Sequence, residues 1–331
     1  MRAAVFNEPG LPLELTDREV STPQAGELFI RLKAAALNRR DYWITQGMYP
    51  GLKSDVIQGS DGAGIVEAVG STEDADWLGK EVIINPGLNW GEDQEVQSTG
   101  FHILGMPQDG TFAQAISVPV ENVFLKPSHL DWQEASALPL AGVTAFRAVT
   151  RGQVATHDTV LITGIGGGVA TMALKFCVAL GAKVLVTSSS PEKIEKAVEL
   201  GATAGFLYSE AGWEKRVSRE YGPVSLILDG AGGPGYFGLL QLAAPGGRVV
   251  NYGATAGAPD KLDLFKVFWK QLRLIGTTMG SSVDFQNMLA CVEEFQIVPS
   301  VDTTFSLETV NQALQHMQSA SQFGKIVLAV E

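Results

Sequence analysis

The segment from Asp158 to Gly181 constrains the fold of this 331-residue chain more than any other stretch. It begins with a short, β-branched apolar run at residues 160–162, which is typical of a strand, and then passes through four closely spaced glycines. Apolar residues follow at helical spacing from Val169 to Leu180. A strand, a glycine turn and a helix in this order form the first half of a dinucleotide-binding βαβ unit.

The glycine cluster predicts a backbone site for a pyrophosphate. Glycines let the chain approach the phosphates closely, and the N-terminus of the following helix offers unpaired N–H groups. The spacing that fits is Gly164-x-x-Gly167-x-x-Ala170, because Val169 occupies the last position of the more familiar G-x-G-x-x-G pattern. A second predicted strand at residues 183–187 favours this interpretation over an ordinary glycine-rich loop. The expected cofactor-binding residues of the turn are Gly164, Gly166, Gly167, Gly168 and Val169.

A second strand–turn–helix unit follows further along the chain. Its predicted elements are a strand at 224–229, a helix at 234–244 and a strand at 247–253. In open α/β sheets, ligands bind beyond the carboxyl ends of the parallel strands. We therefore expect Gly230, Tyr252 and Gly253 beside the same cofactor, and we interpret Asp229 as a structural carboxylate at a strand end.

The first 124 residues have a different pattern, with short alternating segments separated by turns that contain proline and glycine. This pattern predicts a β-rich domain. Its expected strands are residues 2–6, 27–35, 62–69, 81–85 and 113–119. The segment 86–110 is long for a loop in a compact domain, so we expect it to be functional or disordered, and its aromatic residues favour order.

Charge and hydropathy limit the classes of partner. The chain has 36 acidic and 24 basic residues and a net charge of −12, which argues against nucleic acid or an anionic membrane as a partner. The sequence has no signal-peptide core and no apolar run long enough to span a bilayer, so we expect a cytoplasmic protein. Cys177 and Cys291 lie in apolar helical patterns and are expected to be buried rather than reactive.

These motifs resemble the medium-chain dehydrogenase/reductase superfamily over essentially the full length, and most closely its zinc-lacking, quinone-oxidoreductase-like branch. The stretch 59–62, Gly-Ser-Asp-Gly, looks like the superfamily's Gly-His-Glu-Gly signature with Ser60 in place of the metal-binding histidine. Asn38 stands where zinc members carry a zinc-binding cysteine, and Ala141 falls where they carry another ligand. The segment 86–110 occupies the place of the structural-zinc lobe but contains no cysteine. The resemblance therefore implies a member without a metal site.

The fold class implied is α/β, with two domains. A Rossmann domain with a doubly wound parallel sheet is expected at residues 125–270, and a β-rich GroES-like catalytic domain at residues 1–124 and 271–331. The resemblance also implies a homodimer through the edge strand Leu272–Gly280. A zinc site rebuilt from Asp61, Glu67 and His102 is the alternative to a metal-free site, although zinc needs ligands at a fixed geometry that this spacing does not suggest.

The residues after the second predicted strand of the nucleotide unit favour NADP(H) over NAD(H). NAD-binding proteins usually place an acidic residue about 20 positions beyond the glycine turn, whereas this chain has Thr187-Ser-Ser-Ser190. Lys193 follows in the first turn of a helix, where a cation opposes the helix dipole unless it faces an anion. The 2′-phosphate of NADP(H) is the expected anion, with Ser188 and Ser189 as further contacts. The simpler alternative is that Ser190 only caps the helix and Lys193 is solvated.

Several further cofactor contacts are implied by the resemblance alone. Gly142 and Thr144 match a segment that touches the nicotinamide, although plain helix packing would also explain them. Tyr208 matches a tyrosine near the 2′-phosphate, and Lys325 belongs to a terminal motif that can reach the cofactor.

The expected absence of a metal points to the kind of substrate. Hydride addition creates an oxyanion or enolate, whose charge must then be stabilised by hydrogen bonds or by delocalisation within the substrate. Quinones and α,β-unsaturated carbonyls delocalise this charge themselves. The sequence therefore predicts an NADPH-dependent, zinc-independent reductase of quinones or enones. The candidate donors near the nicotinamide are Asn38, Tyr42, Ser60 and Thr144, with Tyr49 as a weaker choice and Asp41 as an orienting residue.

Two other functions remain open from the sequence. The chain could bind NADPH as a redox-sensing or interaction protein with little turnover. It could also reduce an enoyl thioester, although that substrate would require a basic path for the coenzyme A phosphates, and none is visible in the sequence.

Overall fold

The structure is a computed structural model that describes residues 1–20 and 22–330, and the chain folds into two compact units. The first unit comprises Met1–Val143 and Gly280–Glu331, and the second comprises Thr144–Met279. The sequence places the corresponding boundaries at 124/125 and 270/271. The first division falls within helix α3 (Pro139–Arg151).

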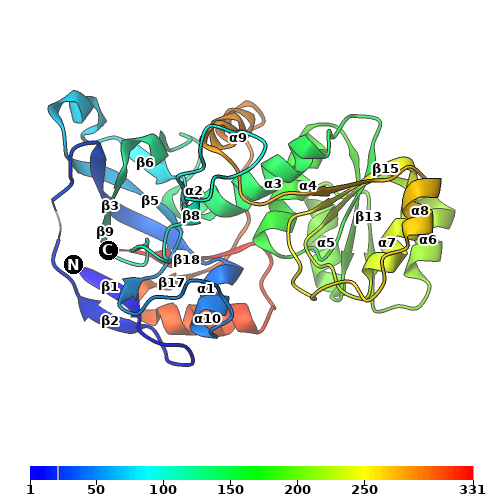
Figure 1. Ribbon diagram of the computed structural model, residues 1–331, viewed down its shortest axis with the longest axis horizontal. Coiled ribbons are helices and arrows are strands. Elements are labelled where there is room, and N and C mark those ends of the chain that lie inside the picture. The colour runs from blue at the N-terminus through cyan, green and yellow to red at the C-terminus, as the bar shows by residue number, and fades with distance from the viewer. Residues whose placement is uncertain (21, 331) are drawn as a thin grey trace. The chain divides into compact units, whose positions relative to one another are not determined.

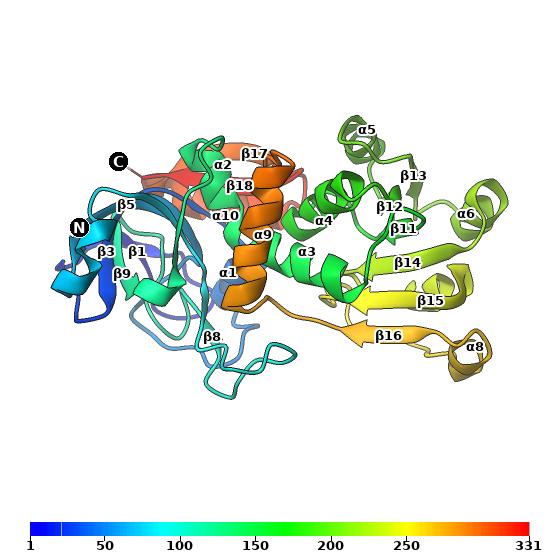
Figure 2. The same cartoon turned by 90° about the horizontal axis from the view of Figure 1, so that it is seen from above.

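The second unit is built on a six-stranded sheet in the order β13-β12-β11-β14-β15-β16, with neighbouring strands parallel (Figures 1 and 2). The strands are β11 (Thr159–Ile162), β12 (Lys183–Ser188), β13 (Ala204–Leu207), β14 (Val224–Asp229), β15 (Ala243–Asn251) and β16 (Arg273–Gly276). The helices of the unit are α4 (Gly168–Ala179), α5 (Pro191–Glu199), α6 (Trp213–Tyr221), α7 (Tyr236–Leu242) and α8 (Leu264–Trp269). This strand order is that of the doubly wound dinucleotide-binding fold, so the predicted Rossmann domain is confirmed.

Local sequence explains these strands. Residues 160–162 and 226–229 are fully buried, as expected for central parallel strands whose two faces are both covered. The helix predicted over 234–244 is shorter than expected, and the reason is tertiary. Ala243 pairs with Val224 and becomes the first residue of β15 instead of the last turn of a helix.

The ends of the strands opposite the glycine turn are fixed by a buried arginine. Arg248 is only 8% exposed and donates to the carbonyl oxygens of Gly152 and Gln153 at 2.8 and 2.9 Å. Its guanidinium also pairs with Asp158, just before β11. Arg248 therefore has a structural role, because it joins β15 to residues 152–153 and to Asp158.

The first unit contains a seven-stranded sheet in the order β10-β6-β5-β3-β18-β17, with β9 paired to β3, and a smaller sheet in the order β2-β1-β4. The strands are β1 (Arg2–Phe6), β2 (Glu14–Asp17), β3 (Glu27–Ala36), β4 (Val56–Ile57), β5 (Asp61–Val69), β6 (Glu81–Ile84), β9 (Ala115–Pro119), β10 (Val123–Leu125), β17 (Val301–Ser306) and β18 (Lys325–Ala329). The helices are α1 (Arg39–Thr45), α2 (Trp132–Ala137), α9 (Ser282–Glu294) and α10 (Val310–Gln318), together with the first turn of α3. The predicted β-rich domain is thus confirmed.

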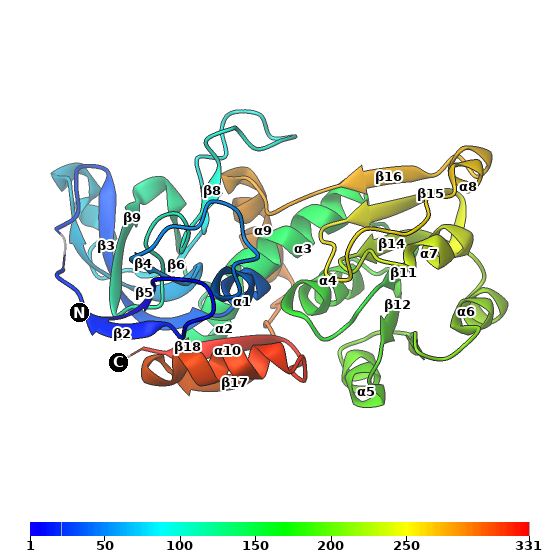
Figure 3. The same cartoon turned by 60° about the horizontal axis from the view of Figure 1, so that its bottom comes forward.

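Segments that are far apart in the sequence meet in this unit. Strand β18 pairs antiparallel with β3, so the last strand joins the sheet of the first 124 residues. Figures 1 and 3 both draw α1 next to α10, and the two helices are in contact. Gly64 permits β5 to lie close to β3, because a Cβ there would be 2.9 Å from the backbone carbonyl carbon of Arg31.

The segment 86–110 packs against the rest of the first unit. It contains the small sheet β7 (Gly87–Leu88) and β8 (His102–Ile103), and the rings of Trp90 and Phe101 meet edge to face at 5.2 Å. Cys177 and Cys291 are both buried and unbridged, as predicted. Within residues 1–20 and 22–330, no helix combines the length and the apolar character needed to cross a bilayer.

Candidate functional site

The glycine turn between β11 and α4 has the features of a phosphate cradle. Gly164 and Gly166 have φ values of +64° and +120°, which side-chain-bearing residues rarely adopt. A Cβ on Gly164 or Gly167 would meet none of the described atoms within 4 Å, so these two positions face open space. No side chain caps α4 at Gly167, and the dipole of that helix favours an anion at this end. The turn therefore fits the pyrophosphate of a dinucleotide.

The turn is joined to the end of β12, where the predicted 2′-phosphate contacts lie. Gly164 N donates to Thr187 Oγ1 at 3.2 Å, and Ile165 N donates to the Thr187 carbonyl at 2.7 Å. Ser188 is buried and its hydroxyl accepts from Ser190 N at 3.2 Å, whereas Ser189 is exposed. Ser189 is thus open to a ligand, whereas the Ser188 hydroxyl is buried and already accepts one hydrogen bond.

Lys193 lies directly over the glycine turn. A Cβ on Gly166 would be 2.7 Å from Lys193 Cδ and 3.3 Å from its Nζ, so the amine reaches the mouth of the turn. Ser190 accepts from Lys193 N at 3.3 Å and caps α5, with Pro191 at the first helical position. Tyr208 follows β13, donates its backbone N–H to the Ser188 carbonyl at 3.0 Å and is half exposed. The backbone N–H of Lys193 takes part in the helix cap while its amine lies at the turn, so the cap and a phosphate contact are compatible.

Asp229 organises the carboxyl ends of β14 and β15. It is fully buried and accepts from Thr163 Oγ1 at 2.6 Å, from Gly232 N at 3.0 Å and from Asn251 Nδ2 at 3.0 Å. These bonds support its interpretation as a structural carboxylate. The adjacent Tyr252 ring covers Gly230, where a Cβ would overlap it.

The predicted cofactor residues at these strand ends lie together. A Cβ on Gly253 would be 3.0 Å from the Gly230 carbonyl oxygen, so both glycines permit a close backbone approach beside Tyr252. Burial, together with the charge of Asp229, raises the pKa of the Tyr252 hydroxyl, which is therefore neutral at physiological pH.

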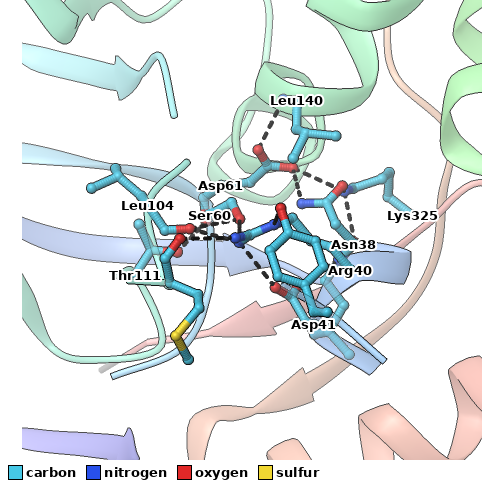
Figure 4. Close-up of polar contacts among 12 residues, drawn as sticks. Asn38, Arg40, Asp41, Ser60, Asp61, Leu104, Thr111, Leu140 and Lys325 are labelled. Carbon is cyan, nitrogen blue, oxygen red and sulfur yellow. Dashed lines mark hydrogen bonds and ion pairs between the residues drawn. The ribbon is translucent and has the colours of Figure 1, made fainter. Parts of the chain in front are cut away.

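In the first unit, three of the predicted catalytic residues, Asn38, Asp41 and Ser60, belong to one buried polar network (Figure 4). Asn38 is the N-cap of α1, and its backbone N–H donates to Asp41 Oδ2 at 2.7 Å. The Asn-x-x-Asp spacing of Asn38 and Asp41 therefore has a local cause, because the residue at the third helical position reaches back to the cap. Asp41 is fully buried, and its Oδ1 lies 3.8 Å from Arg40 Nη1.

Lys325 is at the centre of this network. Its ammonium donates to the Leu37 carbonyl at 2.7 Å, to Asn38 Oδ1 at 2.6 Å and to Asp61 Oδ2 at 2.9 Å. Asp61 also accepts from Asn38 Nδ2 at 2.9 Å and, through Oδ1, from Leu140 N at 2.9 Å. All three ammonium hydrogens are thus used within the first unit. A contact of Lys325 with the cofactor stays a prediction.

Arg40 is the functional candidate that the sequence interpretation missed. It is 6% exposed, and its Nη1 donates to Ser60 Oγ and to the Leu104 carbonyl, both at 2.7 Å. Nη2 donates to the Met106 carbonyl at 3.2 Å, and Nε donates to Tyr49 Oη at 3.3 Å. A second arginine precedes it in the sequence, and nothing in that pattern distinguishes the buried one.

The candidate donors differ in how their hydrogens are used. Ser60 is fully buried and donates its hydroxyl hydrogen to the Leu104 carbonyl at 3.0 Å. Tyr42 is half buried against the apolar cluster around Phe6. Thr144, in the second unit, is 5% exposed and its hydroxyl points to Met279 Sδ at 3.8 Å. Their catalytic roles stay predictions.

Gly142 has a packing explanation in addition to its predicted role. A Cβ there would be 2.6 Å from Met288 Sδ and 2.7 Å from Leu138 Cδ1. The glycine therefore lets α3 approach α9 closely. Its contact with a cofactor stays a prediction.

The residues of the alternative zinc site are occupied by other partners. Asp61 pairs with Lys325, Glu67 pairs with Arg31 at 3.0 Å, and the His102 ring contacts the Gly100 carbonyl and Gln108 at 3.0 Å each. Among residues 1–20 and 22–330, no three His, Cys, Asp or Glu side chains are grouped so that they could hold a metal ion.

Comparison with known proteins places both units in one family. Residues 24–128 match the alcohol dehydrogenase GroES-like domain, and residues 168–294 match the zinc-binding dehydrogenase family. The chain is 35% identical to the zinc-type alcohol dehydrogenase-like protein YogA of Leptosphaeria maculans, covering 96% of this chain and 95% of that protein.

Two further relatives define the range of named activities. The chain is 28% identical to an acryloyl-coenzyme A reductase of Sulfurisphaera tokodaii, with 99% of each protein covered. A crystal structure of an NAD-dependent alcohol dehydrogenase superposes with a TM-score of 0.93 at 34% identity and covers 100% of both chains.

Replacing Asp41 by asparagine should flatten the pH dependence of stability. Burial raises the pKa of this carboxyl to about 6, against the opposing charge of Arg40. The folded state therefore binds the proton more tightly than the unfolded state, whose pKa is about 3.9. As the pH rises from about 4 to above about 6, the free energy of unfolding of the wild-type protein should fall by about 3 kcal/mol relative to that of Asp41→Asn.

Urea unfolding of both proteins across this pH range measures the difference. Asp17→Asn, at a side chain that is 84% exposed, is the control and should follow the wild-type curve. Parallel curves for wild type and Asp41→Asn would contradict the prediction.

Proposed function

Because this chain belongs to the medium-chain dehydrogenase/reductase superfamily, we propose that it is an NADPH-dependent, zinc-independent reductase of quinones or α,β-unsaturated carbonyls. Its relatives establish the coarser class, an oxidoreductase that uses a nicotinamide cofactor. The finer proposal is supported chiefly by one observation. The side chains at the signature positions, Asn38, Ser60 and Asp61, are engaged by two buried cations of the protein itself, Lys325 and Arg40.

The cofactor, when bound, supplies the hydride. The residues that would hold it are those of the glycine turn, whose open cradle fits a pyrophosphate, and those at the ends of β12 and β14. Beside the end of β14, Tyr252 carries a neutral hydroxyl, Gly230 and Gly253 carry no side chain, and the Asp229 carboxylate is bonded to Thr163 and Gly232. This arrangement suits the uncharged surface of a reduced nicotinamide.

In the first unit, the Asn38 amide is the best-placed donor for developing negative charge. The Lys325 ammonium donates to its Oδ1, and its Nδ2 donates one hydrogen to Asp61, so the amide orientation is fixed from both sides. Nδ2 carries a second hydrogen, which remains for an acceptor. One neutral N–H stabilises an oxyanion less than a metal ion does, and this favours substrates that delocalise the charge themselves.

A second candidate function is reduction of an enoyl thioester. The observation that favours it is the 28% identity to an acryloyl-coenzyme A reductase over nearly the whole of both chains. The chemistry is compatible with the same site, because a conjugated thioester also spreads charge over its enolate. The candidates differ in the recognition of the coenzyme A phosphates.

A panel of acceptors should separate these functions. With NADPH as donor, we expect quinones and enones to be reduced and simple aldehydes to be reduced far more slowly, measured as NADPH oxidation at 340 nm. Efficient turnover of crotonyl- or acryloyl-coenzyme A alone would favour the thioester candidate. Cofactor binding without turnover of any acceptor would indicate a sensing protein. Stoichiometric zinc in the purified protein, found by elemental analysis, would overturn the metal-free proposal.

Lys193→Glu should weaken binding of NADPH much more than binding of NADH, because only NADPH carries the 2′-phosphate. The amine at the mouth of the glycine turn would bond the 2′-phosphate, and a charge-assisted bond contributes about 1.5–3 kcal/mol, or roughly 10- to 150-fold in affinity. Calorimetry with both cofactors measures the preference. Lys196→Glu, on the exposed side of the same helix, is the matched control. An unchanged ratio of the two affinities in Lys193→Glu would remove the phosphate contact from the proposal.

The proposal includes a homodimer through the edge of the parallel sheet. Among the strands formed by residues 1–20 and 22–330, β16 pairs with β15 alone, and an unpaired strand edge is a template for pairing with another chain. The neighbouring α8 exposes Phe265, Phe268 and Trp269, at 59%, 62% and 71%, and the Phe265 and Trp269 rings stack at 5.7 Å. An apolar patch of this kind marks an interface, and a second copy would cover the edge and the patch together.

The double variant Phe265→Asp/Trp269→Asp should therefore be monomeric, because two carboxylates would be buried in the interface. Sedimentation velocity of the wild type and the variant measures the state. Phe295→Asp, at a single exposed aromatic residue of the first unit, should remain dimeric. A wild-type protein that is monomeric at micromolar concentration would exclude this interface.

A further inference from the structure

We propose that Arg40 is the positioning residue of the candidate site, holding the Ser60 turn and the 104–106 segment against the start of α1. This inference deepens the proposed function and depends on it only for its kinetic test. The evidence is the set of contacts that a single guanidinium makes with three parts of the chain that are distant in sequence.

The first step of the argument is geometric. The planar guanidinium donates to Ser60 Oγ and to two carbonyl oxygens, those of Leu104 and Met106, from its two terminal nitrogens. Ser60 in turn donates to the same Leu104 carbonyl, so these three groups form a closed set. Figure 4 shows Arg40 between Ser60 and Asp41. With the bond from Nε to Tyr49, the guanidinium makes four bonds from three nitrogens, and a lysine cannot reproduce them because its ammonium has three donors on one atom.

The second step concerns α1. Arg40 is the second residue of this helix, and Asn38 is its N-cap. The guanidinium also stacks over the Tyr49 ring at 4.8 Å, beyond the end of the helix. Fixing Arg40 therefore fixes the position of the backbone that carries Asn38, the donor assigned above to developing charge. Arg40 acts through Asn38 and Ser60 and is not itself assigned a contact with substrate.

The third step is electrostatic. The charged groups that face Asp41 are Arg40 and Lys325, which lower its pKa, and Asp61, which raises it, while burial has the largest effect and raises it. The positive charges of Arg40 and Lys325 are matched in number by negative charges only when Asp41 is ionised as well as Asp61. Loss of the Arg40 charge should therefore raise the pKa of Asp41 further and protonate it at neutral pH.

Two variants and one control test this role. Arg40→Met keeps the aliphatic stem but removes the charge and the fork, and Arg40→Lys keeps the charge alone. Arg248→Met is the control, since Arg248 is equally buried and also bonds two carbonyl oxygens, but lies in the second unit. The readouts are NADPH affinity, kcat and KM across pH for a quinone, amide exchange of residues 102–110, and carbon-13 titration of Asp41.

For Arg40→Met we expect unchanged NADPH affinity, a kcat lower by about a hundredfold, faster exchange in residues 102–110 and an upward shift of the Asp41 titration. The acidic limb of the pH profile of kcat should move to higher pH together with the Asp41 titration. Arg40→Lys should restore the Asp41 titration more than it restores kcat. Arg248→Met should lower thermal stability and leave the other readouts unchanged.

The proposal would be overturned if Arg40→Met kept the wild-type kcat, amide exchange and Asp41 titration. It would also be overturned if Arg248→Met showed the changes expected for Arg40→Met. If Arg40→Met does not fold, the split between titration and kcat in Arg40→Lys decides the question. If the wild type reduces no acceptor, the proposed function fails, whereas exchange and titration still test the role of Arg40.

Discussion

The ion pair between Lys325 and Asp61 joins four parts of the first unit, and the candidate site depends on it. Both side chains are almost completely buried, so each loses its hydration and must be compensated by the other and by further hydrogen bonds. The compensation is complete for the ammonium, which has three acceptors, and Asp61 accepts bonds on both oxygens. Removing either partner would leave an unpaired buried charge, which costs several kcal/mol.

This requirement explains why the surrounding residues are so constrained. Asn38 must present its oxygen to Lys325 and its nitrogen to Asp61, so its orientation is determined by charge. The backbone N–H of Leu140 at the start of α3 completes the set, where a carboxylate is also favoured by the helix dipole. Asn38 and Ser60, which stand at metal-ligand positions of the family, thus belong to a network of dipoles whose orientations are fixed by hydrogen bonds.

The two units differ in how far the sequence predicts them. The nucleotide unit depends on local patterns: the run 160–162, the glycine turn and Ser190-Pro191 each determine their own conformation, and the strand order follows from the fold class. The network in the first unit depends on contacts across long separations. Lys325 and Asp61 are 264 residues apart and Arg40 and Leu104 are 64 apart, so no local spacing reveals them. Asn38 and Ser60 were identified only because the resemblance marks their positions.

The same contrast has a chemical consequence. A metal ion stabilises charge wherever its open coordination position points, and its strength depends little on the surrounding protein. A network of protein dipoles stabilises charge only in the direction in which its remaining donors are held, because reorienting them in response to charge would cost free energy. Lys325 bonds the Asn38 amide and Asp61 directly, whereas Arg40, in the proposed positioning role, holds Ser60 and the carbonyls of the 104–106 segment. The proposed selectivity for acceptors that already delocalise charge would then follow from the limited number of donors that so constrained a site can offer.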